Sequence, residues 1–265
     1  MSGYHNVKGA GALSQRATRL VERLKTRKGR VREALVLVEG VRCVGAALDA
    51  GAPIRFAVVA PSLEDRPEGA TLIERLGAAH VDIRAVDDDE LAALADTEAP
   101  QGVLAVAEEP RTELTDLRPG CWLVLDAVQD PGNAGTLVRA ATAFGVDGVV
   151  SLDGTVDLWG PKAVRASAGL VYRVPIVRAD VGALVQRCGS EGVEILVADA
   201  SGEDVAGLGA AERVALVVGN EGAGVRDELV RAAGRRVSVP MQGSVESLNV
   251  GVAGSILLYA ISEYR

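Results

Sequence analysis

Cysteine and histidine are both scarce in this sequence, and their scarcity narrows the chemistry open to it. The three cysteines, Cys43, Cys121 and Cys188, lie far apart, which fits neither a disulfide framework nor closely spaced zinc ligands. The two histidines, His5 and His80, leave little material for a histidine metal centre or a nucleophile–histidine triad. We therefore expect buried cysteines, no metal and no catalytic histidine.

Long hydrophobic runs are missing as well. The apolar stretches are far shorter than the roughly 20 residues that a helix needs to span a bilayer. The first residues also lack the charged and then apolar pattern of a secretory leader. We expect a cytoplasmic protein, and its 265 residues with 48% hydrophobic content are enough for two domains with separate cores.

The charge is unevenly distributed. The net charge is −8, yet residues 1–33 hold nine basic side chains against two acidic ones, a local charge of +7 that leaves −15 for the remainder. The overall balance argues against a nucleic-acid partner, whereas a concentrated basic arm is compatible with RNA. The alternative is a helix whose charges are merely solvated.

Short β-rich runs alternate with helix-like runs along the first hundred residues. From Ser14 to about Lys28, apolar residues recur at three- and four-residue spacing between arginines, which predicts an amphipathic basic helix. Strands are expected near 34–40, 55–60, 81–86 and 102–108, and helices over 41–50, 71–79 and 88–95. This alternation predicts an α/β layer structure.

The segment 108–120 is charged, contains two prolines and lacks apolar periodicity, so it is the best linker candidate. We place one domain at 1–107, the linker at 108–118 and a second domain at 119–265. Strand candidates in the second half are near-continuous apolar runs, as expected of parallel strands buried on both faces. They lie at 121–128, 148–152, 193–199, 213–219 and 235–240, with helices expected at 134–144, 158–168, 180–190, 225–233 and 246–262.

Three glycine-punctuated segments follow expected strands in the second half, where open α/β sheets hold their ligands. They read DAVQDPGNAGTLVRAATAFG from Asp126, VVGNEGAGV from Val217 and VPMQGSVESLNVGVAGSILLYA from Val239. Their patterns match no dinucleotide G-x-G-x-x-G, no P-loop and no G-x-S-x-G nucleophile elbow. A polar set is thus left without an assignment: Asn133, Arg139, Glu221, Ser247 and Asn249.

In order and internal spacing, the three segments resemble the motifs of the SpoU/TrmH group of the SPOUT methyltransferases. The N-terminal RLVERLKTRKGRVREALVLVEGVRCVGAAL is similar to the L30e-like substrate-binding domain of several members. The resemblance implies an α/β fold whose C-terminal parallel sheet carries a trefoil knot, a feature otherwise rare in proteins, together with a smaller N-terminal α/β domain.

The resemblance also implies the cofactor, S-adenosylmethionine, bound in a bent form by backbone groups of the second and third motifs. The matching positions are Gly219, Val239, Met241 and Leu248. A glycine suits the first of these because a purine approaches the backbone closely only where no Cβ intervenes. The catalytic set that the resemblance implies is Arg139 near the ribose, completed by Asn133, Glu221, Ser247 and Asn249.

Two roles for Arg139 remain open. Methyl transfer requires alignment of the 2′-hydroxyl with the methyl carbon and removal of the hydroxyl proton. Because a guanidinium stays protonated at ordinary pH, Arg139 acts either as an unusual base or by binding a phosphate and orienting the hydroxyl. Asn133 is expected near the start of helix 134–144, as a cap or as a partner of Arg139. Glu221 and Asn249 are either turn and helix-start residues or functional ones.

RNA contacts are expected from basic residues in both halves: Arg16, Arg19, Arg23, Lys25, Arg27, Lys28, Arg30 and Arg165. Lys162 and Ser167 lie beside Arg165, and an exposed helix without an RNA role is the alternative there. The resemblance to rRNA-directed members implies ribose 2′-O-methylation in 23S large-subunit rRNA. The alternatives are a tRNA substrate, a role in antibiotic resistance, and an RNA-binding knot protein without turnover. The family resemblance also implies a homodimer, in which the final helix and the helix of the first motif pack across a two-fold axis.

Overall fold

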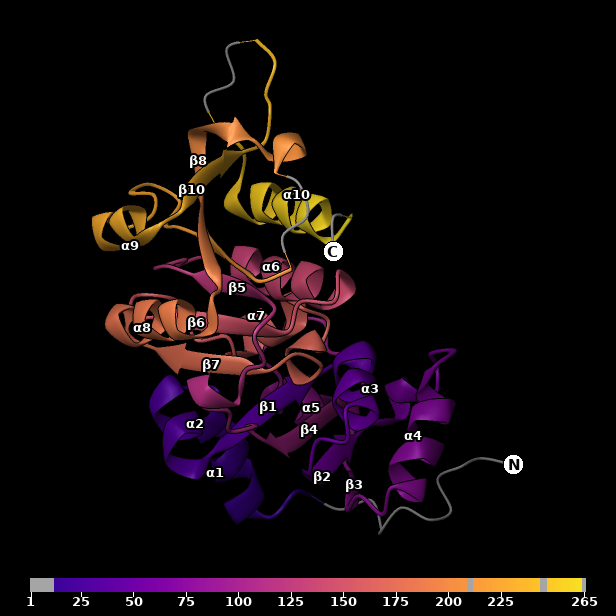
Figure 1. Cartoon of the computed structure of the whole chain (residues 1–265). Helices are drawn as coiled ribbons and strands as arrows, with labels where there is room; N and C mark the ends of the chain where they lie inside the picture. The colour runs from indigo at the N-terminus through magenta and orange to yellow at the C-terminus, as the bar shows by residue number, and fades with distance from the viewer. Residues whose placement is uncertain (1–11, 209–211, 244–246, 264–265) are drawn as a thin grey trace. The chain divides into compact units, whose positions relative to one another are not determined.

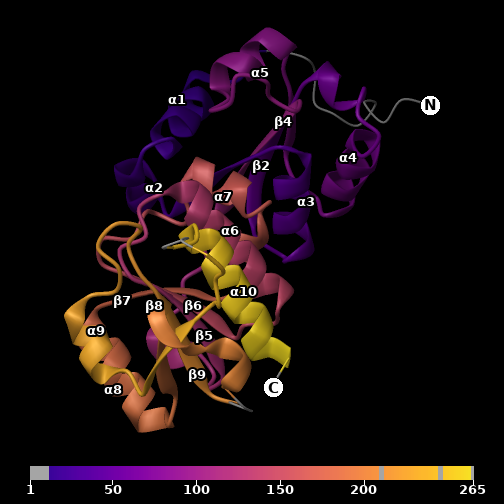
Figure 2. The same ribbon diagram turned by 90° about the horizontal axis from the view of Figure 1, so that it is seen from above.

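The computed structural model describes residues 12–208, 212–243 and 247–263, without the side chain of residue 263. Lys8 of the basic arm lies outside these residues. The chain forms two compact units, one comprising residues up to Pro110 together with Trp159–Arg173, the other comprising Arg111–Leu158 and the chain from Val174 onward. Each unit is built around its own β-sheet (Figures 1 and 2).

The sheet of the first unit is mixed, in the order β1-β4-β2-β3. Its strands are β1 (Leu35–Glu39), β2 (Ile54–Val59), β3 (Ile83–Ala85) and β4 (Val103–Glu108). β4 runs antiparallel to β1 and β2, whereas β2 and β3 are parallel. The helices α1 (Gln15–Leu24) and α5 (Asp88–Leu94) contribute Leu24 and Leu91 to one apolar core with the strands, while α3 (Val41–Asp49) packs on β1 and β4, with α4 (Gly69–Ala78) against it.

The basic segment forms two short helices, so the prediction of one helix from Ser14 to Lys28 is wrong. α1 ends at Leu24 and α2 spans Arg27–Glu33. Thr26 caps α2, its Oγ1 accepting from the amide N of Gly29 at 3.1 Å and donating to the carbonyl O of Arg23 at 2.9 Å. A Cβ on Gly29 would lie 1.9 Å from that carbonyl oxygen, so only glycine allows the two helices to meet this closely.

The helix expected over 158–168 is α7 (Pro161–Ala166), and it packs on β1 within the first unit. A 3₁₀ turn, Leu170–Tyr172, follows it and contacts α3. Ser167 is fully buried and its Oγ donates to the carbonyl O of Val164 at 2.8 Å. The interpretation of this stretch as an exposed helix is therefore wrong, although the side chain of Lys162 is exposed.

The second unit confirms the expected parallel sheet, in the order β10-β8-β9-β5-β6-β7. The strands are β5 (Cys121–Leu125), β6 (Gly148–Leu152), β7 (Ile176–Ala179), β8 (Glu194–Asp204), β9 (Val214–Val218) and β10 (Arg235–Ser238). The edge strand β7 was not predicted. β5 and β9, which lie inside the sheet, are buried at every position, as the continuous apolar runs indicated.

Helices cover both faces of this sheet (Figures 1 and 2). α6 (Pro131–Ala143) and α10 (Val250–Glu263) lie side by side on one face, with α8 (Val181–Glu191) and α9 (Asp227–Ala232) on the other. Alternate strand residues such as Trp122 and Val124 point into the core beneath α8 and α9. Of the described helices, none is long and apolar enough to cross a membrane.

β8 makes a detour that the sequence did not reveal. Val197 pairs with Arg236 of β10, but the next pair along β10 is Val237 with Glu203, so residues 198–202 have no partner on that strand. A Cβ on Gly202 would lie 2.7 Å from the backbone of Arg236 and Val237, and this contact requires glycine. The detour brings residues 198–200 to the wall of the pocket described next.

Candidate active site

A pocket of about 390 Å³ lies in the second unit, at the carboxyl end of β9, and is bordered by the detour of β8 and the end of β10. All four residues expected to bind the cofactor line it, as do three of the expected catalytic residues. The lining comprises Ala198, Asp199, Ala200, Val218, Gly219, Asn220, Glu221, Gly224, Val237, Ser238, Val239, Met241, Ser247, Leu248, Asn249, Val250, Ala253 and Leu257. Apolar side chains predominate, and no lysine, arginine or histidine is among these described lining residues.

The loop after β9 is held closed by its own hydrogen bonds. The amide N of Asn220 donates to the carbonyl O of Gly224 at 3.0 Å, and the reverse bond measures 2.9 Å. Oδ1 of Asn220 accepts from the amides of Gly222 and Ala223, and its Nδ2 donates to the carbonyl O of Ala127. A Cβ on Gly219 would lie 2.3 Å from the carbonyl C of Gly224. The loop itself therefore requires this glycine, whatever a ligand demands.

One side chain from each of the three glycine-punctuated segments takes part in a single hydrogen-bond network. Nδ2 of Asn133 donates to Oε1 of Glu221 at 3.0 Å, and Nδ2 of Asn249 donates to Oδ1 of Asn133 at 2.9 Å. The backbone amides of Gln129 and Asp130 also donate to Glu221, both at 3.3 Å. Desolvation tends to raise the pKa of Glu221, but these hydrogen bonds outweigh it and hold the pKa below its ordinary value.

Asn133 lies in the first turn of α6, as expected, but it has neither of the two roles expected of it. Asp130 is the N-cap of α6, and its Oδ1 accepts from the amide N of Asn133 at 2.7 Å. The side chain of Asn133 bonds to Glu221 and Asn249 instead of Arg139. Asn249 is a helix-start residue, as one of its two interpretations expected, since its Oδ1 accepts from the amides of Gly251 and Val252 at the start of α10. Its functional role stays a prediction.

The other two expected catalytic residues, Arg139 and Ser247, lie outside this hydrogen-bond network. Ser247 lines the pocket and is exposed. Arg139 lies on an exposed position of α6, outside the pocket lining, and makes no hydrogen bond or ion pair with the described part of the chain.

An ion pair between a buried carboxylate and a partly exposed arginine, which the sequence did not predict, supports the loop after β9. Asp126 is 1% exposed, and it accepts from the amide N of Arg226 at 2.8 Å and from its Nε at 2.6 Å. Nη2 of Arg226 also donates to the carbonyl O of Asp153 at 2.8 Å. Because Asp126 directly follows β5, this pair connects the loops that follow β5, β6 and β9. The sequence signal was an aspartate at the end of an apolar run.

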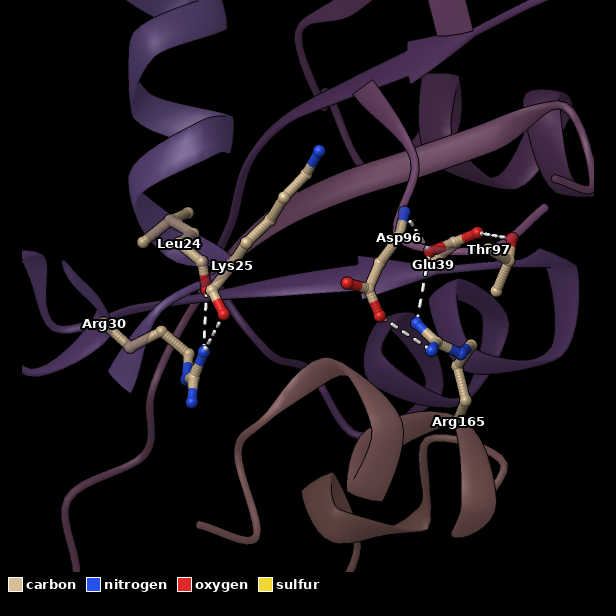
Figure 3. Close-up of polar contacts among 7 residues, drawn as sticks. All are labelled: Leu24, Lys25, Arg30, Glu39, Asp96, Thr97 and Arg165. Atoms are coloured by element: carbon tan, nitrogen blue, oxygen red, sulfur yellow. Dashed lines mark hydrogen bonds and ion pairs between the residues drawn. The ribbon is translucent and has the colours of Figure 1, made fainter. Parts of the chain in front are cut away.

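The basic residues of the α1–α2 segment that were expected to contact RNA fall into three groups. Arg16, Arg19, Arg27 and Lys28 are exposed and have no ion-pair partner among the described residues. Arg23 pairs with Glu33 at 3.3 Å and Lys25 with Glu22 at 2.8 Å. Arg30 is only 4% exposed, and its Nη1 donates to the carbonyl oxygens of Leu24 and Lys25 at the end of α1 (Figure 3).

Arg165 is also committed to an internal network (Figure 3). Its Nη2 lies 2.8 Å from Oδ2 of Asp96, and its Nη1 lies 3.2 Å from Oε2 of Glu39. The carboxylate of Glu39 is buried and additionally accepts from the amide N of Asp96 and from Oγ1 of Thr97. Arg30 and Arg165 thus stabilise the fold, and the prediction that both present their charge to RNA is not supported by these contacts.

A pocket at the carboxyl end of a parallel sheet, together with a polar network from three segments, defines a ligand-binding α/β protein. Helices cover both faces of its sheet. Residues 120–259 match the family described as SpoU rRNA Methylase, and residues 15–105 match the MRM3-like substrate binding domain. The chain belongs to the SpoU rRNA methylase family.

Relatives and solved structures match across nearly the whole chain. The 23S rRNA (guanosine(2553)-2'-O)-methyltransferase RlmP of Bacillus subtilis is 35% identical over 239 residues, 90% of this chain and 92% of that protein. The AdoMet-bound rRNA methyltransferase from Sinorhizobium meliloti has a TM-score of 0.85 at 28% identity and covers 97% of this chain and 98% of its own. The SpoU methyltransferase AviRb from Streptomyces viridochromogenes, in complex with AdoMet, has a TM-score of 0.82 at 26% identity, with 94% and 98% covered.

Proposed function

We propose that this protein transfers a methyl group from S-adenosylmethionine to the 2′-hydroxyl of a ribose in 23S rRNA. The observation that carries the proposal is the joining of three sequence segments at one site, through Asn133, Glu221 and Asn249, beside a largely apolar pocket. Family membership and the rRNA methyltransferases among the relatives support the same reaction class. A ribosomal substrate would place the protein in the cytoplasm.

The pocket fits the methyl donor in size and in chemistry. Its volume of about 390 Å³ lies within the range of roughly 300–1,000 Å³ typical of small-molecule sites. Gly219, Val239, Met241 and Leu248 would hold the donor through backbone groups and apolar contact. When bound, S-adenosylmethionine supplies an electrophilic methyl group on a sulfonium centre. Carboxylates and no basic side chains among the described lining residues suit a ligand of that charge.

The polar network would position the ribose. Glu221 remains ionised because its pKa is held low, and it fixes the amide of Asn133, which in turn fixes Asn249. Ser247 and Asn249 line the pocket and would orient the 2′-hydroxyl. Arg139 would bind the neighbouring phosphate through its guanidinium or, in a deprotonated form, receive the hydroxyl proton.

A homodimer would place a second subunit close to Arg139. Val252, Ile256 and Tyr259 are exposed on α10 at spacings of four and three residues, so they form one apolar face. The ring of Tyr259 packs against Phe144 at the end of α6, 5.5 Å between centroids. A second copy seated on this face would stand close to α6 and its exposed Arg139. Light scattering should give a dimer mass, and Ile256→Glu should reduce it to a monomer mass.

The RNA would be held by the exposed cations of α1 and α2 for which the described part of the chain supplies no ion-pair partner, namely Arg16, Arg19, Arg27 and Lys28. These exposed charges are free to release counterions from phosphate, whereas Arg23 and Lys25 would first have to leave carboxylate partners. The match of residues 15–105 to a substrate-binding domain supports this location.

The trefoil knot is the remaining part of the proposal. β10 lies at one edge of the sheet, whereas α10, which follows it in the chain, packs on α6 and contacts β9 inside the sheet. A pocket lined from both the β9 loop and the segment after β10 is the arrangement that a knotted C-terminus would produce.

Methyl incorporation from labelled S-adenosylmethionine into ribosomal RNA tests the reaction. Purified protein should label 23S rRNA from cells that lack the gene, and digestion should release a single 2′-O-methylated nucleotide. Arg139→Ala should abolish labelling while cofactor binding in calorimetry persists. Labelling of tRNA in place of 23S rRNA would redirect the substrate. Absence of labelling in either RNA, with RNA binding intact, would favour a binding protein without turnover.

A further inference from the structure

Asp199 lines the pocket although neither strand pairing nor core packing requires it there. It lies within the detour of residues 198–202, which have no partner on β10. Its side chain is 30% exposed. With Glu221 it is one of two carboxylates in a lining that holds no basic residue among the described positions.

The two oxygens of Asp199 are used unequally. Oδ1 accepts from the amide N of Ser201 at 2.9 Å and from its Oγ at 2.8 Å, and these bonds fix the carboxylate in place. Among the described residues, Oδ2 accepts only a long contact of 3.4 Å from Nη1 of Arg236. Since an ionised carboxylate oxygen can accept two hydrogen bonds, Oδ2 keeps capacity for a ligand.

The charge of Asp199 persists through the neutral range. Hydrogen bonds from Ser201, followed by the charge of Arg236, hold the pKa of the Asp199 carboxyl below its ordinary value against the effect of desolvation. Arg236 offsets part of this negative charge, but its side chain is 52% exposed, so solvent screens the offset.

We propose that the Asp199 carboxylate makes the pocket selective for the positively charged methyl donor over its product. S-adenosylmethionine carries a positive charge at sulfur that S-adenosylhomocysteine lacks, while the two molecules are otherwise closely similar in shape. A fixed negative charge in an apolar pocket favours the first more than the second. The consequence is weaker product retention after each transfer. This inference rests on the proposed use of S-adenosylmethionine and names a specificity-determining residue for it.

Calorimetry with the purified full chain tests the proposal without reference to turnover. Asp199→Asn keeps an acceptor for Ser201 and removes the charge. The Kd for S-adenosylmethionine should then rise roughly fivefold, and that for S-adenosylhomocysteine less than about twofold, at low ionic strength. Arg236→Gln should shift the ratio of the two Kd values in the opposite direction. Glu203→Gln, a matched exposed carboxylate of β8 outside the pocket lining, should leave both unchanged.

The outcomes separate this inference from the proposed function. Equal weakening of both ligands by Asp199→Asn, or no weakening, would overturn the selectivity role while leaving the cofactor assignment intact. If the wild type took up neither ligand, the cofactor assignment itself would fail. An unchanged Tm for Asp199→Asn would establish that any loss is local to the pocket. Added salt should reduce the wild-type preference for the charged donor, because screening weakens the attraction.

Discussion

The side-chain amide of Asn249 donates to Oδ1 of Asn133 at 2.9 Å, across 116 residues of sequence. Asn133 passes the connection on to Glu221 through its own Nδ2. Each amide is used as donor at one end and acceptor at the other, so the orientation of Asn133 is fixed. An asparagine is required at the centre, because an aspartate there could not donate to Glu221.

Asn133→Asp should therefore disrupt the site. Two carboxylates at this distance repel each other, and we expect kcat/KM to fall at least tenfold, which corresponds to about 1.4 kcal/mol of transition-state stabilisation. Steady-state methyl transfer measures this effect. Asn133→Ala is the matched control, since it removes the hydrogen bonds without adding charge.

The same variant should also change the dependence of stability on pH. In the wild type the lowered pKa of Glu221 contributes stability above the ordinary carboxyl pKa, and this contribution is lost as pH falls through the lowered value. In Asn133→Asp the like charges raise the carboxyl pKa values, so the penalty is full at neutral pH and disappears in acid. Thermal unfolding from pH 4 to 8 should give a Tm gap that narrows as pH falls. Asn133→Ala also loses the hydrogen bond that lowers the pKa of Glu221, so its gap should narrow too, but less. A gap for Asn133→Asp that narrows no more than that of Asn133→Ala would contradict the repulsion.

Gly219→Ala should collapse the loop after β9. The added methyl group would lie 2.3 Å from the carbonyl C of Gly224, and relieving this overlap requires breaking the pair of hydrogen bonds between Asn220 and Gly224. We expect a loss of about 2 kcal/mol or more in the free energy of unfolding, with loss of cofactor binding. Gly222→Ala, where the nearest atom is 3.7 Å away, should bind as the wild type does. Equal effects of the two changes would mean that the loop is not held closed.

Arg30→Ala should act on stability and Arg27→Ala on RNA. Removal of the buried Arg30 leaves the carbonyl oxygens of Leu24 and Lys25 without these bonds, and we expect a cost of about 2 kcal/mol in denaturant unfolding. Arg27 is exposed at the start of α2, where a positive charge is not favoured by the helix dipole. Its replacement should be neutral for stability yet lower the salt slope of RNA binding by about one. If Arg30→Ala instead weakened RNA binding and Arg27→Ala lowered stability, both assignments would be wrong.

Arg165→Ala should destabilise the first unit because a buried negative charge loses its ion-pair partner. It leaves the buried Glu39 without its cationic partner, for which we expect a cost of about 3 kcal/mol. Adding Glu39→Gln to this variant should restore part of the stability, because the uncompensated charge is then gone. Lys162→Ala on the same helix, at an exposed position, should have no effect on unfolding. Failure of the second change to restore stability would show that packing, not charge, is lost.

Much of the second unit could be predicted because β5 and β9, at the centre of its sheet, are apolar at every position. Continuous runs such as Cys121–Leu125 and Val214–Val218 indicate parallel strands directly, and the glycine segments that follow them locate the pocket. The strand β7 escaped because it has only four residues, and Arg178 within it is exposed. The detour in β8 escaped because it depends on register with β10, which no local pattern encodes.

The sequence predicted which residues line the candidate site better than it predicted the contacts that these residues make. Gly219, Val239, Met241 and Leu248 all line the pocket, but the reason for Gly219 lies in the backbone of Gly224. The basic residues show the opposite failure. A count of charges cannot reveal that Arg30 turns inward to carbonyl groups or that Arg165 meets Glu39, because both partners are distant in sequence or uncharged. The domain limits at 107 and 119 stay a prediction.

Residues 159–173 return to the first unit after the second has begun, so the polypeptide passes from one unit to the other three times. A chimaera made by joining two family members within 108–118 would therefore combine a foreign α7 with the native β1. Glu39 would then face whatever residue the donor sequence carries at position 165. Successful grafts should need this fifteen-residue insert to be exchanged together with the N-terminal unit.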